Sequence, residues 1–296
     1  MSEQVKQHPG HPSKLADELL SLTTDEGLFS ILAIDHGQSL LSLLGNGDES
    51  DHGPMREAKI AVLGLLAQHC TAVLVDVPLT GTIGTLWHPP EGVGLIVGLD
   101  EFDYDDVECP PPNVPSRELL RRLRRAGANA AKIVLYYHPN ALDAAARLEA
   151  VTQVAEQCHD EGLPLLVEPL PLPMGGSSDG SAWPAAEIAE KVAKTGADIL
   201  KLPLTLGSQT AALAADITKA AAGTPWILLS SGAPYSEFLE TLRVALLGGA
   251  AGFAAGRSIW GDLVVDVTDD DARAESSQRL AEAAALTRSL GGVHRT

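Results

Sequence analysis

Residues 130–168 read AAKIVLYYHPNALDAAARLEAVTQVAEQCHDEGLPLLVE, and this stretch indicates the fold. It begins with an apolar run (Ala130–Tyr136), continues with a segment rich in Ala, Leu and Glu (Asn140–His159), and ends in a second apolar run (Pro164–Glu168). The Glu161-Gly162 pair marks a helix end, because glycine readily takes the left-handed conformation of a helix cap. Runs that are apolar on both faces are typical of parallel strands buried on both sides. The stretch therefore predicts a strand, a helix and a second, parallel strand.

The same alternation extends over most of the chain. Strands are predicted at Phe29–Asp35, Ala72–Val77, Gly94–Gly98, Ala130–Tyr136, Pro164–Glu168, Asp198–Leu202, Trp226–Ser230 and Ala250–Ala254. Helices are predicted at Met55–His69, Ser116–Ala126, Asn140–His159, Trp183–Thr195, Gln209–Ala222, Tyr235–Leu247 and Ala274–Leu290. Eight such strands predict an α/β protein, a single (β/α)8 TIM barrel.

The domain organisation follows from the same pattern. An open dinucleotide-binding sheet would need G-x-G-x-x-G after its first strand, and the sequence there is Asp35-His36-Gly37-Gln38. We expect one domain over residues 1–296, with an N-terminal extension carrying a short helix at 1–27 and a C-terminal helix within 263–296.

Composition and charge argue against several classes of protein. The chain has 296 residues, a hydrophobic fraction of 45% and a formal net charge of −18, which argues against a nucleic-acid partner. The basic cluster at 121–125 is expected to be the solvated face of a helix. No apolar run reaches the ~18 residues of a membrane span, and the first residues lack a signal peptide's apolar segment. Three cysteines without Cys-x-x-Cys spacing favour neither disulfides nor a thiolate metal site. We expect a cytoplasmic protein without membrane partners; a homo-oligomer is compatible with the sequence.

Polar residues at the carboxyl ends of the strands carry the functional information in a barrel, because active sites lie at that end. They are Asp35, Asp76, Asp100, Lys132, Glu168, Lys201, Ser230-Ser231-Gly232 and Gly256-Arg257. His36, Gln38 and Asp76 are further candidates for contact with a substrate.

Two lysines are unusual, because Lys132 and Lys201 lie inside apolar strands, where an unpaired ammonium is costly. The alternative is that such a lysine only forms a structural ion pair with a carboxylate at the barrel mouth. Two lysines and Glu168 on adjacent strands favour function, since neighbouring positive charge and desolvation both favour the neutral amine that attacks a carbonyl. This pattern indicates Schiff-base chemistry with Lys201 as nucleophile, Lys132 as charged neighbour and Glu168 as acid/base. The spacing leaves the reverse assignment of the two lysines open.

The last two strands suggest an anion site. Ser230, Ser231 and Gly232 precede a helix whose start is marked by Pro234, and Gly256-Arg257 follows the eighth strand. Phosphate-binding loops after strands seven and eight recur in this fold, and arginine makes two-pronged contacts with phosphate. Two ordinary turns with a surface arginine are the alternative.

Several of these segments resemble the class I aldolase family that contains tagatose-1,6-bisphosphate aldolase and sulfofructosephosphate aldolase. The similar segments are 131–137 (AKIVLYY), 166–169 (LVEP), 196–201 (GADILK), 226–232 (WILLSSG) and 251–260 (AGFAAGRSIW). The resemblance implies cleavage of a ketose phosphate to dihydroxyacetone phosphate and an aldehyde, with no cofactor or metal. It places the Schiff base on Lys201, the second lysine on Lys132, the acid/base on Glu168 and the first-strand aspartate on Asp35. It also places the donor phosphate on Ser231, Gly232 and Arg257.

Two departures from that family concern the substrate. Its usual Asp-Gln-Arg is Asp35-His36-Gly37 here, which is closer to a branch with archaeal fructose-bisphosphate aldolases and a quorum-signal thiolase. Its Lys-Val-Glu is Lys201-Leu202-Pro203. Both departures concern recognition of the substrate hydroxyl groups more than the imine step. The resemblance to the family also implies sulfofructose-1-phosphate as an alternative substrate.

Two other classes of protein remain less favoured alternatives. A metal-dependent aldolase could use His36, His88 and His138, although the histidines lack His-x-His and His-Glu-x-x-His spacing. A non-catalytic barrel that binds sugar phosphates would keep Arg257 and the serines functional and leave Lys201 dispensable.

Overall fold

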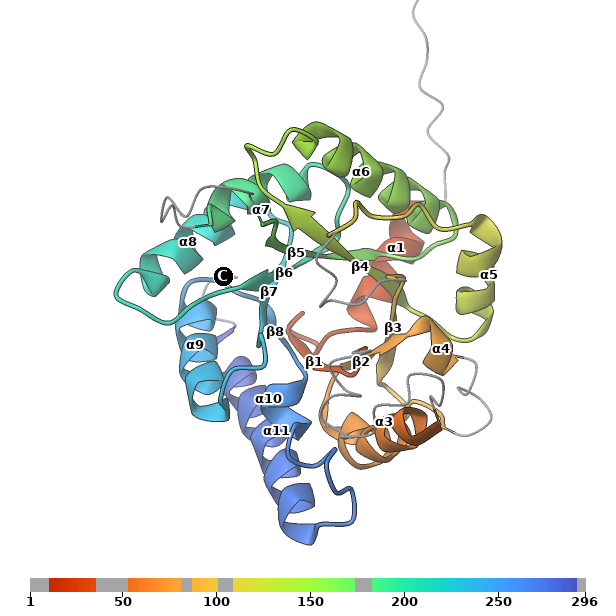
Figure 1. Cartoon of the computed structure of the whole chain (residues 1–296), viewed down its shortest axis with the longest axis vertical. Helices are drawn as coiled ribbons and strands as arrows, with labels where there is room; N and C mark the ends of the chain where they lie inside the picture. Colours follow the sequence, from red (N-terminus) through yellow and green to blue (C-terminus); the bar gives the residue numbers. More distant parts are fainter. Residues whose placement is uncertain (1–10, 36–52, 81–86, 101–108, 174–182, 292–296) are drawn as a thin grey trace, which may run out of the picture.

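The computed structural model describes residues 11–35, 53–80, 87–100, 109–173 and 183–291. Eight parallel strands pair in chain order, and the last pairs with the first, closing a barrel (Figure 1). They are β1 (Phe29–Ala33), β2 (Ala72–Asp76), β3 (Gly94–Gly98), β4 (Ala130–Tyr137), β5 (Leu165–Pro171), β6 (Ile199–Pro203), β7 (Trp226–Leu229) and β8 (Gly252–Ala255). The predicted TIM barrel is confirmed. The strand ends differ most at β5, which continues to Pro171.

Helices surround the barrel (Figure 1). Those described are α1 (His11–Leu20), α3 (Gly53–Leu66) with the 3-10 turn η1 (Ala67–His69), α4 (Val77–Thr80), α5 (Arg117–Arg125), α6 (Ala144–Asp160), α7 (Ala185–Ala193), α8 (Thr210–Ala220), α9 (Tyr235–Leu247), α10 (Arg257–Trp260) and α11 (Asp270–Leu290). The one-turn helices α4 and α10 were not predicted from the sequence. Within the described ranges, none of these helices combines the length and the apolar character needed to cross a bilayer.

The basic cluster lies on α5, as predicted. Ser116 caps this helix, since its hydroxyl accepts a hydrogen bond from the Leu119 N–H. Arg121 pairs with Glu161 at 3.1 Å, at the end of the neighbouring α6. Leu120 and Leu123 are buried on the opposite face. The arginines therefore form the solvated face of an amphipathic helix.

Successive residues of each strand point to opposite faces, and this alternation divides the core in two. Side chains such as Val73, Leu135 and Leu200 belong to the large cluster between the strands and the helices. Their neighbours Leu74 and Ile199 belong to a smaller cluster inside the barrel. The interior is thus filled with side chains, which leaves one end of the barrel to carry a site.

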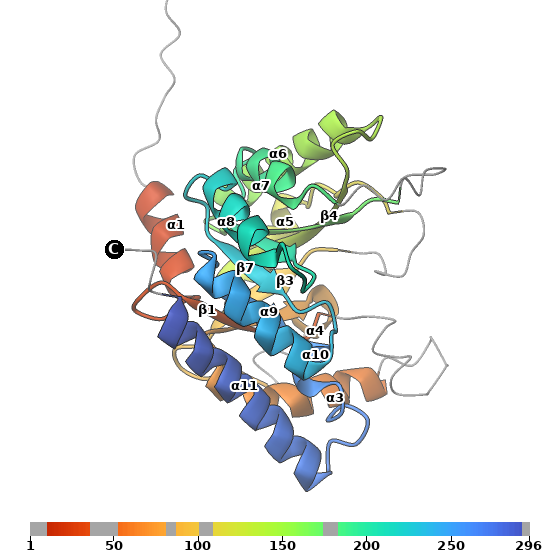
Figure 2. The ribbon, with the colours of Figure 1, turned by 90° about the vertical axis from the view of Figure 1, so that its left-hand side faces the viewer.

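The amino end of the barrel is closed by the segment that follows α1. Leu22 is completely buried among the interior side chains. A Cβ at Gly94, the first residue of β3, would lie 2.6 Å from the Leu22 Cδ2, so Leu22 packs directly against this glycine. Figure 2 shows α1 at one end of the barrel and α4 and α10 toward the other. The carboxyl ends of the strands therefore form the open mouth.

Candidate active site

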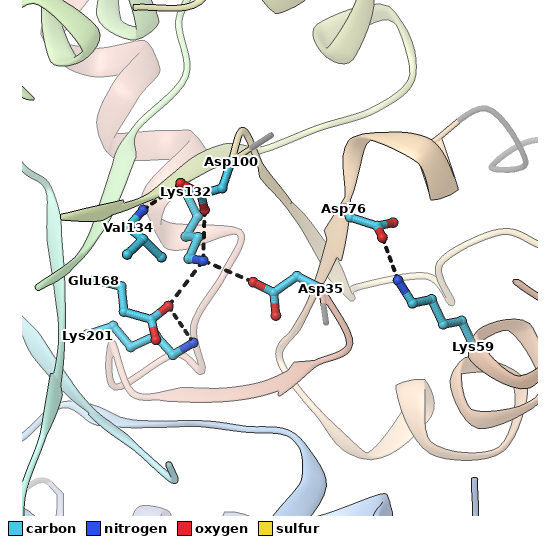
Figure 3. A network of polar contacts seen from close by, with 8 residues as sticks. All are labelled: Asp35, Lys59, Asp76, Asp100, Lys132, Val134, Glu168 and Lys201. Atoms are coloured by element: carbon cyan, nitrogen blue, oxygen red, sulfur yellow. Dashed lines mark hydrogen bonds and ion pairs between the residues drawn. The ribbon is translucent and has the colours of Figure 1, made fainter. Parts of the chain in front are cut away.

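Lys132 lies at the centre of a buried cluster of charges (Figure 3). Its Nζ is 3.1 Å from Asp35 Oδ2, 3.0 Å from Asp100 Oδ2 and 3.2 Å from Glu168 Oε2. Its side chain has no exposed surface. The three carboxylates come from the ends of β1 and β3 and from β5, so the closed barrel brings distant parts of the chain to one ammonium group.

Lys201 enters the cluster from β6. Its Nζ donates to Glu168 Oε2 at 3.0 Å, the same oxygen that lies 3.2 Å from the Lys132 Nζ. Lys201 is 3% exposed and Glu168 is 5% exposed. One carboxylate oxygen therefore faces both amines. The four residues predicted from the sequence as catalytic, Asp35, Lys132, Glu168 and Lys201, lie together.

The two-residue alternation of the strands explains this convergence. Ala33, Ala130, Leu166 and Ile199 are interior residues, and each lies two positions before Asp35, Lys132, Glu168 and Lys201, respectively. The same face of each strand therefore changes from apolar to ionisable at the same level. The cluster forms one layer across the barrel mouth.

The surroundings shift the pKa values of two carboxyl groups of the cluster in opposite directions. Burial works to raise the pKa of Glu168, but Lys201 and then Lys132 hold it below its usual range. Burial raises the pKa of Asp100, and the opposing attraction of Lys132 does not offset it. Burial, with the nearby Cys109, Glu168 and Asp100, also raises the pKa of Tyr136 to about 12. Glu168 is thus favoured as a carboxylate, which can accept a proton.

Asp100 is the member of the cluster to which the sequence analysis gave no role. Its Oδ2 accepts from Lys132, and its Oδ1 accepts from the Val134 N–H at 2.8 Å. The signal in the sequence was its place two residues after Gly98, the last residue of β3. The alternation that predicts Lys132 and Glu168 also predicts an inward Asp100.

Asp76 is a predicted substrate contact that the structure places outside this cluster (Figure 3). Its Oδ2 accepts from Lys59 on α3, at 2.5 Å, and its Oδ1 accepts from the Leu79 N–H in α4. The sequence analysis missed Lys59, a third buried lysine, because it lies on a helix. The turn into α4 and the Lys59 ammonium together explain why the Asp76 carboxylate leaves the interior face.

The predicted phosphate-binding residues also lie together. Ser230 Oγ accepts from the Gly256 N–H at 3.5 Å. A Cβ at Gly232 would lie 3.4 Å from both the Nε and an Nη of Arg257, so the guanidinium packs against this glycine. Gly232 and Ser231 have φ values of 67° and 52°, so this turn is left-handed.

The Arg257 guanidinium carries an unused donor. Its Nε is buried and has no hydrogen-bond partner among the residues that the structure describes. A buried donor without a partner is costly unless a ligand supplies the acceptor. The arrangement suits an anion between the two loops.

The remaining predicted substrate contacts, His36 and Gln38, lie outside the described residues. For the metal alternative, no group of three or more His, Cys, Asp or Glu in the described ranges could hold a metal ion. His138 Nδ1 accepts from the Asn140 N–H at 3.2 Å, a local turn contact.

Comparison with known proteins identifies the family. The model of the DeoC/LacD family of aldolases matches residues 29–262, which span all eight strands. The chain belongs to the DeoC/LacD aldolase family. It is therefore an aldolase, a lyase, as the resemblance implied.

Individual relatives are distant. The chain is 26% identical over 304 residues to tagatose 1,6-diphosphate aldolase 1 of Enterococcus faecalis, covering 93% of this chain and 89% of that protein. It is 26% identical over 289 residues to the protein of the same name in Streptococcus pyogenes serotype M1, covering 86% and 88%.

Solved structures support the fold. The fructose-bisphosphate aldolase from Slackia heliotrinireducens superposes with a TM-score of 0.66 at 22% identity, covering 97% of this chain and 94% of that one. An archaeal fructose 1,6-bisphosphate aldolase gives 0.65 at 20% identity, covering 93% and 99%.

Proposed function

We propose that this aldolase is of class I and that Lys201 forms the Schiff base with a phosphorylated ketose. One observation carries the proposal: the buried Lys201 Nζ lies 3.0 Å from Glu168 Oε2, and Lys132 lies 3.2 Å from the same oxygen. An amine can become a nucleophile when a neighbouring base takes its proton and a second cation disfavours its charge. Here one oxygen of Glu168 is in contact range of both amines.

The contacts of the two lysines support Lys201 as the one that reacts. Lys132 is completely buried and contacts three carboxylates, and these opposite charges favour its ammonium form against the cost of burial. Lys201 contacts Glu168 alone among the ion pairs of the described residues, and it retains some exposure. Lys201 is therefore the amine that is better placed to meet a substrate.

The reaction then needs only groups of this cluster. Glu168 takes a proton from Lys201, and the neutral amine attacks the ketose carbonyl carbon. Glu168 returns that proton to the hydroxyl group of the adduct, which leaves as water to give an iminium and restores the Glu168 carboxylate. The bond between the third and fourth carbons breaks, its electron pair moves into the iminium to form an enamine, and the Glu168 carboxylate takes the proton of the fourth-carbon hydroxyl. The aldehyde leaves, Glu168 returns the proton to the third carbon of the enamine, and water hydrolyses the resulting iminium to release the product and the Lys201 amine. Lys132 stays an ammonium and balances the charge on Glu168, and no cofactor is required.

The substrate class follows from the second pair of loops. The unpaired Arg257 Nε, the Gly232 turn and Ser231 support binding of the phosphate that becomes part of dihydroxyacetone phosphate. The curated relatives act on tagatose 1,6-bisphosphate, as their name states, and we propose a substrate of that type. Sulfofructose-1-phosphate is the second candidate.

Borohydride reduction followed by intact-mass and peptide analysis tests the proposal. Tagatose 1,6-bisphosphate, fructose 1,6-bisphosphate, sulfofructose-1-phosphate and dihydroxyacetone phosphate would be offered in turn. We expect the mass of reduced dihydroxyacetone phosphate on Lys201, and no adduct on a Lys201→Met variant. Substrate turnover without any adduct, or an adduct on another lysine, would contradict it.

A further inference from the structure

The buried cluster contains two carboxyl groups, Asp35 and Asp100, that the proposed reaction does not use. Asp35, Asp100 and Glu168 provide three acids against two amines, Lys132 and Lys201. Glu168 has a role in proton transfer, and Asp35 approaches Lys132 from β1. Asp100 approaches the same Nζ from the end of β3, at 3.0 Å, and contacts no other amine in the described ion pairs.

Asp100 is held in one orientation. Its Oδ1 accepts from the Val134 N–H at 2.8 Å, while its Oδ2 accepts from Lys132. Val134 and Lys132 are two residues apart on β4, so the carboxylate spans one repeat of that strand. A carboxylate fixed to the backbone in this way holds the lysine side chain beside it.

This arrangement is not one that maximises stability. The carboxyl groups of Asp100 and Glu168 are both buried, but burial raises the pKa of Asp100 whereas the two lysines lower that of Glu168. Keeping Asp100 ionised therefore costs folding free energy. Charges retained at such a cost are concentrated at functional sites.

We propose that Asp100 is a positioning residue that keeps Lys132 as an ammonium directed at Glu168, so that Lys201 and not Lys132 is the amine that reacts. The inference rests on the proposed class I chemistry. It attributes the difference in reactivity between the two lysines to Asp100. Asp100 acts through Lys132, which in turn sets the charge that Glu168 and Lys201 experience.

The test compares Asp100→Asn with Asp76→Asn. Asp76 is a matched control because its carboxylate makes the same two kinds of contact. One oxygen accepts from a buried lysine, and the other accepts from a backbone N–H. The readouts are the pH profile of kcat, the lysine trapped by borohydride with dihydroxyacetone phosphate, and the thermal midpoint. The groups that face Lys132 and shape the profile are Asp35, Asp100, Glu168, Lys201 and Tyr136.

In Asp100→Asn we expect kcat to fall about 10-fold or more at neutral pH, on the scale of a displaced acid–base partner. The alkaline limb of the profile should move to lower pH, because the Lys132 ammonium has lost one of its three carboxylates. Some of the borohydride label should appear on Lys132, and the thermal midpoint should hold or rise. Asp100→Glu should return the alkaline limb toward that of the unchanged protein, and Asp76→Asn should leave the limb and the labelled lysine as they are.

An Asp100→Asn variant that fails to fold, or that folds with an unchanged alkaline limb, would overturn the inference, because Asp100 would then serve stability alone. Absence of any label on Lys201 in the unchanged protein is a different result. It would overturn the proposed Schiff base itself.

Discussion

The interior of the barrel has two layers that differ sharply although they lie on the same strands. Toward the amino ends, Ala130, Leu166 and Ile199 are fully buried among apolar side chains. Two residues further along, Lys132, Glu168 and Lys201 form the charged layer. One repeat of the strand therefore separates a layer that stabilises the fold from a layer that performs chemistry.

The difference between the two layers indicates that stability and reactivity depend on different residues. Apolar burial contributes about 25 cal/mol per Å² whatever the partner, so the lower layer tolerates substitutions of similar volume. The charged layer must place each atom within hydrogen-bonding distance of the next, and it contributes little net stability because desolvation opposes the ion pairs. Substitutions in the two layers should accordingly affect different measurements.

The largest expected effect is on turnover, from Lys201→Ala. Removing the proposed nucleophile leaves only binding and electrostatic contributions, so kcat should fall about a thousand-fold or more while the variant still unfolds cooperatively in a thermal scan. Steady-state kinetics and a thermal scan check both. Lys191→Ala, on the outer face of α7 and half-exposed beside Glu187, is the control and should retain activity. Turnover within about ten-fold of the original would remove Lys201 from the mechanism.

The second largest effect is on stability and not on turnover, and we expect it from Ile199→Ala in the apolar layer. The cavity should cost about 2–5 kcal/mol of unfolding free energy, because Ile199 is completely buried. Urea unfolding measures this, and kcat of the folded fraction should change little. The exposed Leu142 provides the control, since Leu142→Ala removes no buried surface. If Ile199→Ala abolished turnover at full stability, the two layers would not be separate.

A smaller effect, on substrate affinity, is expected from Arg257→Ala. Losing a charge-assisted contact of about 1.5–3 kcal/mol should raise KM about 10- to 100-fold with kcat nearly unchanged. Arg243→Ala, exposed on α9, is the control. Unphosphorylated dihydroxyacetone offers a further check, because borohydride trapping of it should not distinguish Arg257→Ala from the unchanged protein. A loss confined to kcat would place Arg257 outside phosphate binding.

The smallest effect concerns stability against pH within the charged layer. The pKa of Glu168 is lower in the folded protein than its reference of 4.5, so Glu168 contributes stability above that value and loses it as pH falls through the folded pKa. Asp100 has the opposite sign: its raised pKa means that its ionised form costs stability, and that cost disappears as pH falls from its folded pKa toward 3.8.

Glu168→Gln should therefore lower the unfolding free energy at pH 7, and its deficit should close as pH falls below 4.5. Asp100→Asn should shift the free energy at pH 7 the other way. Urea unfolding at both pH values measures each variant. Equal shifts of one sign would show that the two carboxyl groups are not distinguished by their surroundings.

Much of the site follows from local pattern. Lys132 and Lys201 stand out because a charged residue interrupts an apolar strand, and Glu168 because it ends one. Ser230, Gly232, Gly256 and Arg257 follow from the rule that phosphate loops come after strands seven and eight. These are properties of neighbouring residues, so they are visible without coordinates.

The ion pairs of Asp76 with Lys59 and of Asp100 with Lys132 are not local, and neither was predicted from the sequence. Asp76 has the same strand-end position as Asp35, and its carboxylate turns to Lys59 because α4 begins immediately after β2. Nothing near Asp100 in the sequence indicates that it meets a lysine 32 positions later. Strand ends alone do not reveal which carboxylate reaches which amine.

The order of apolar runs, helix ends and polar strand ends was sufficient to define the barrel, its mouth and the family, because side-chain alternation and helix periodicity are set by adjacent residues. The tertiary structure decided how the charges are shared. It gave Lys132 three carboxylates and Lys201 one, since the closure of β1 against β8 and the register of β4 with β5 fix distances between residues up to 97 positions apart. Electrostatic interactions depend on those distances and on burial, and both exist only once the barrel has closed.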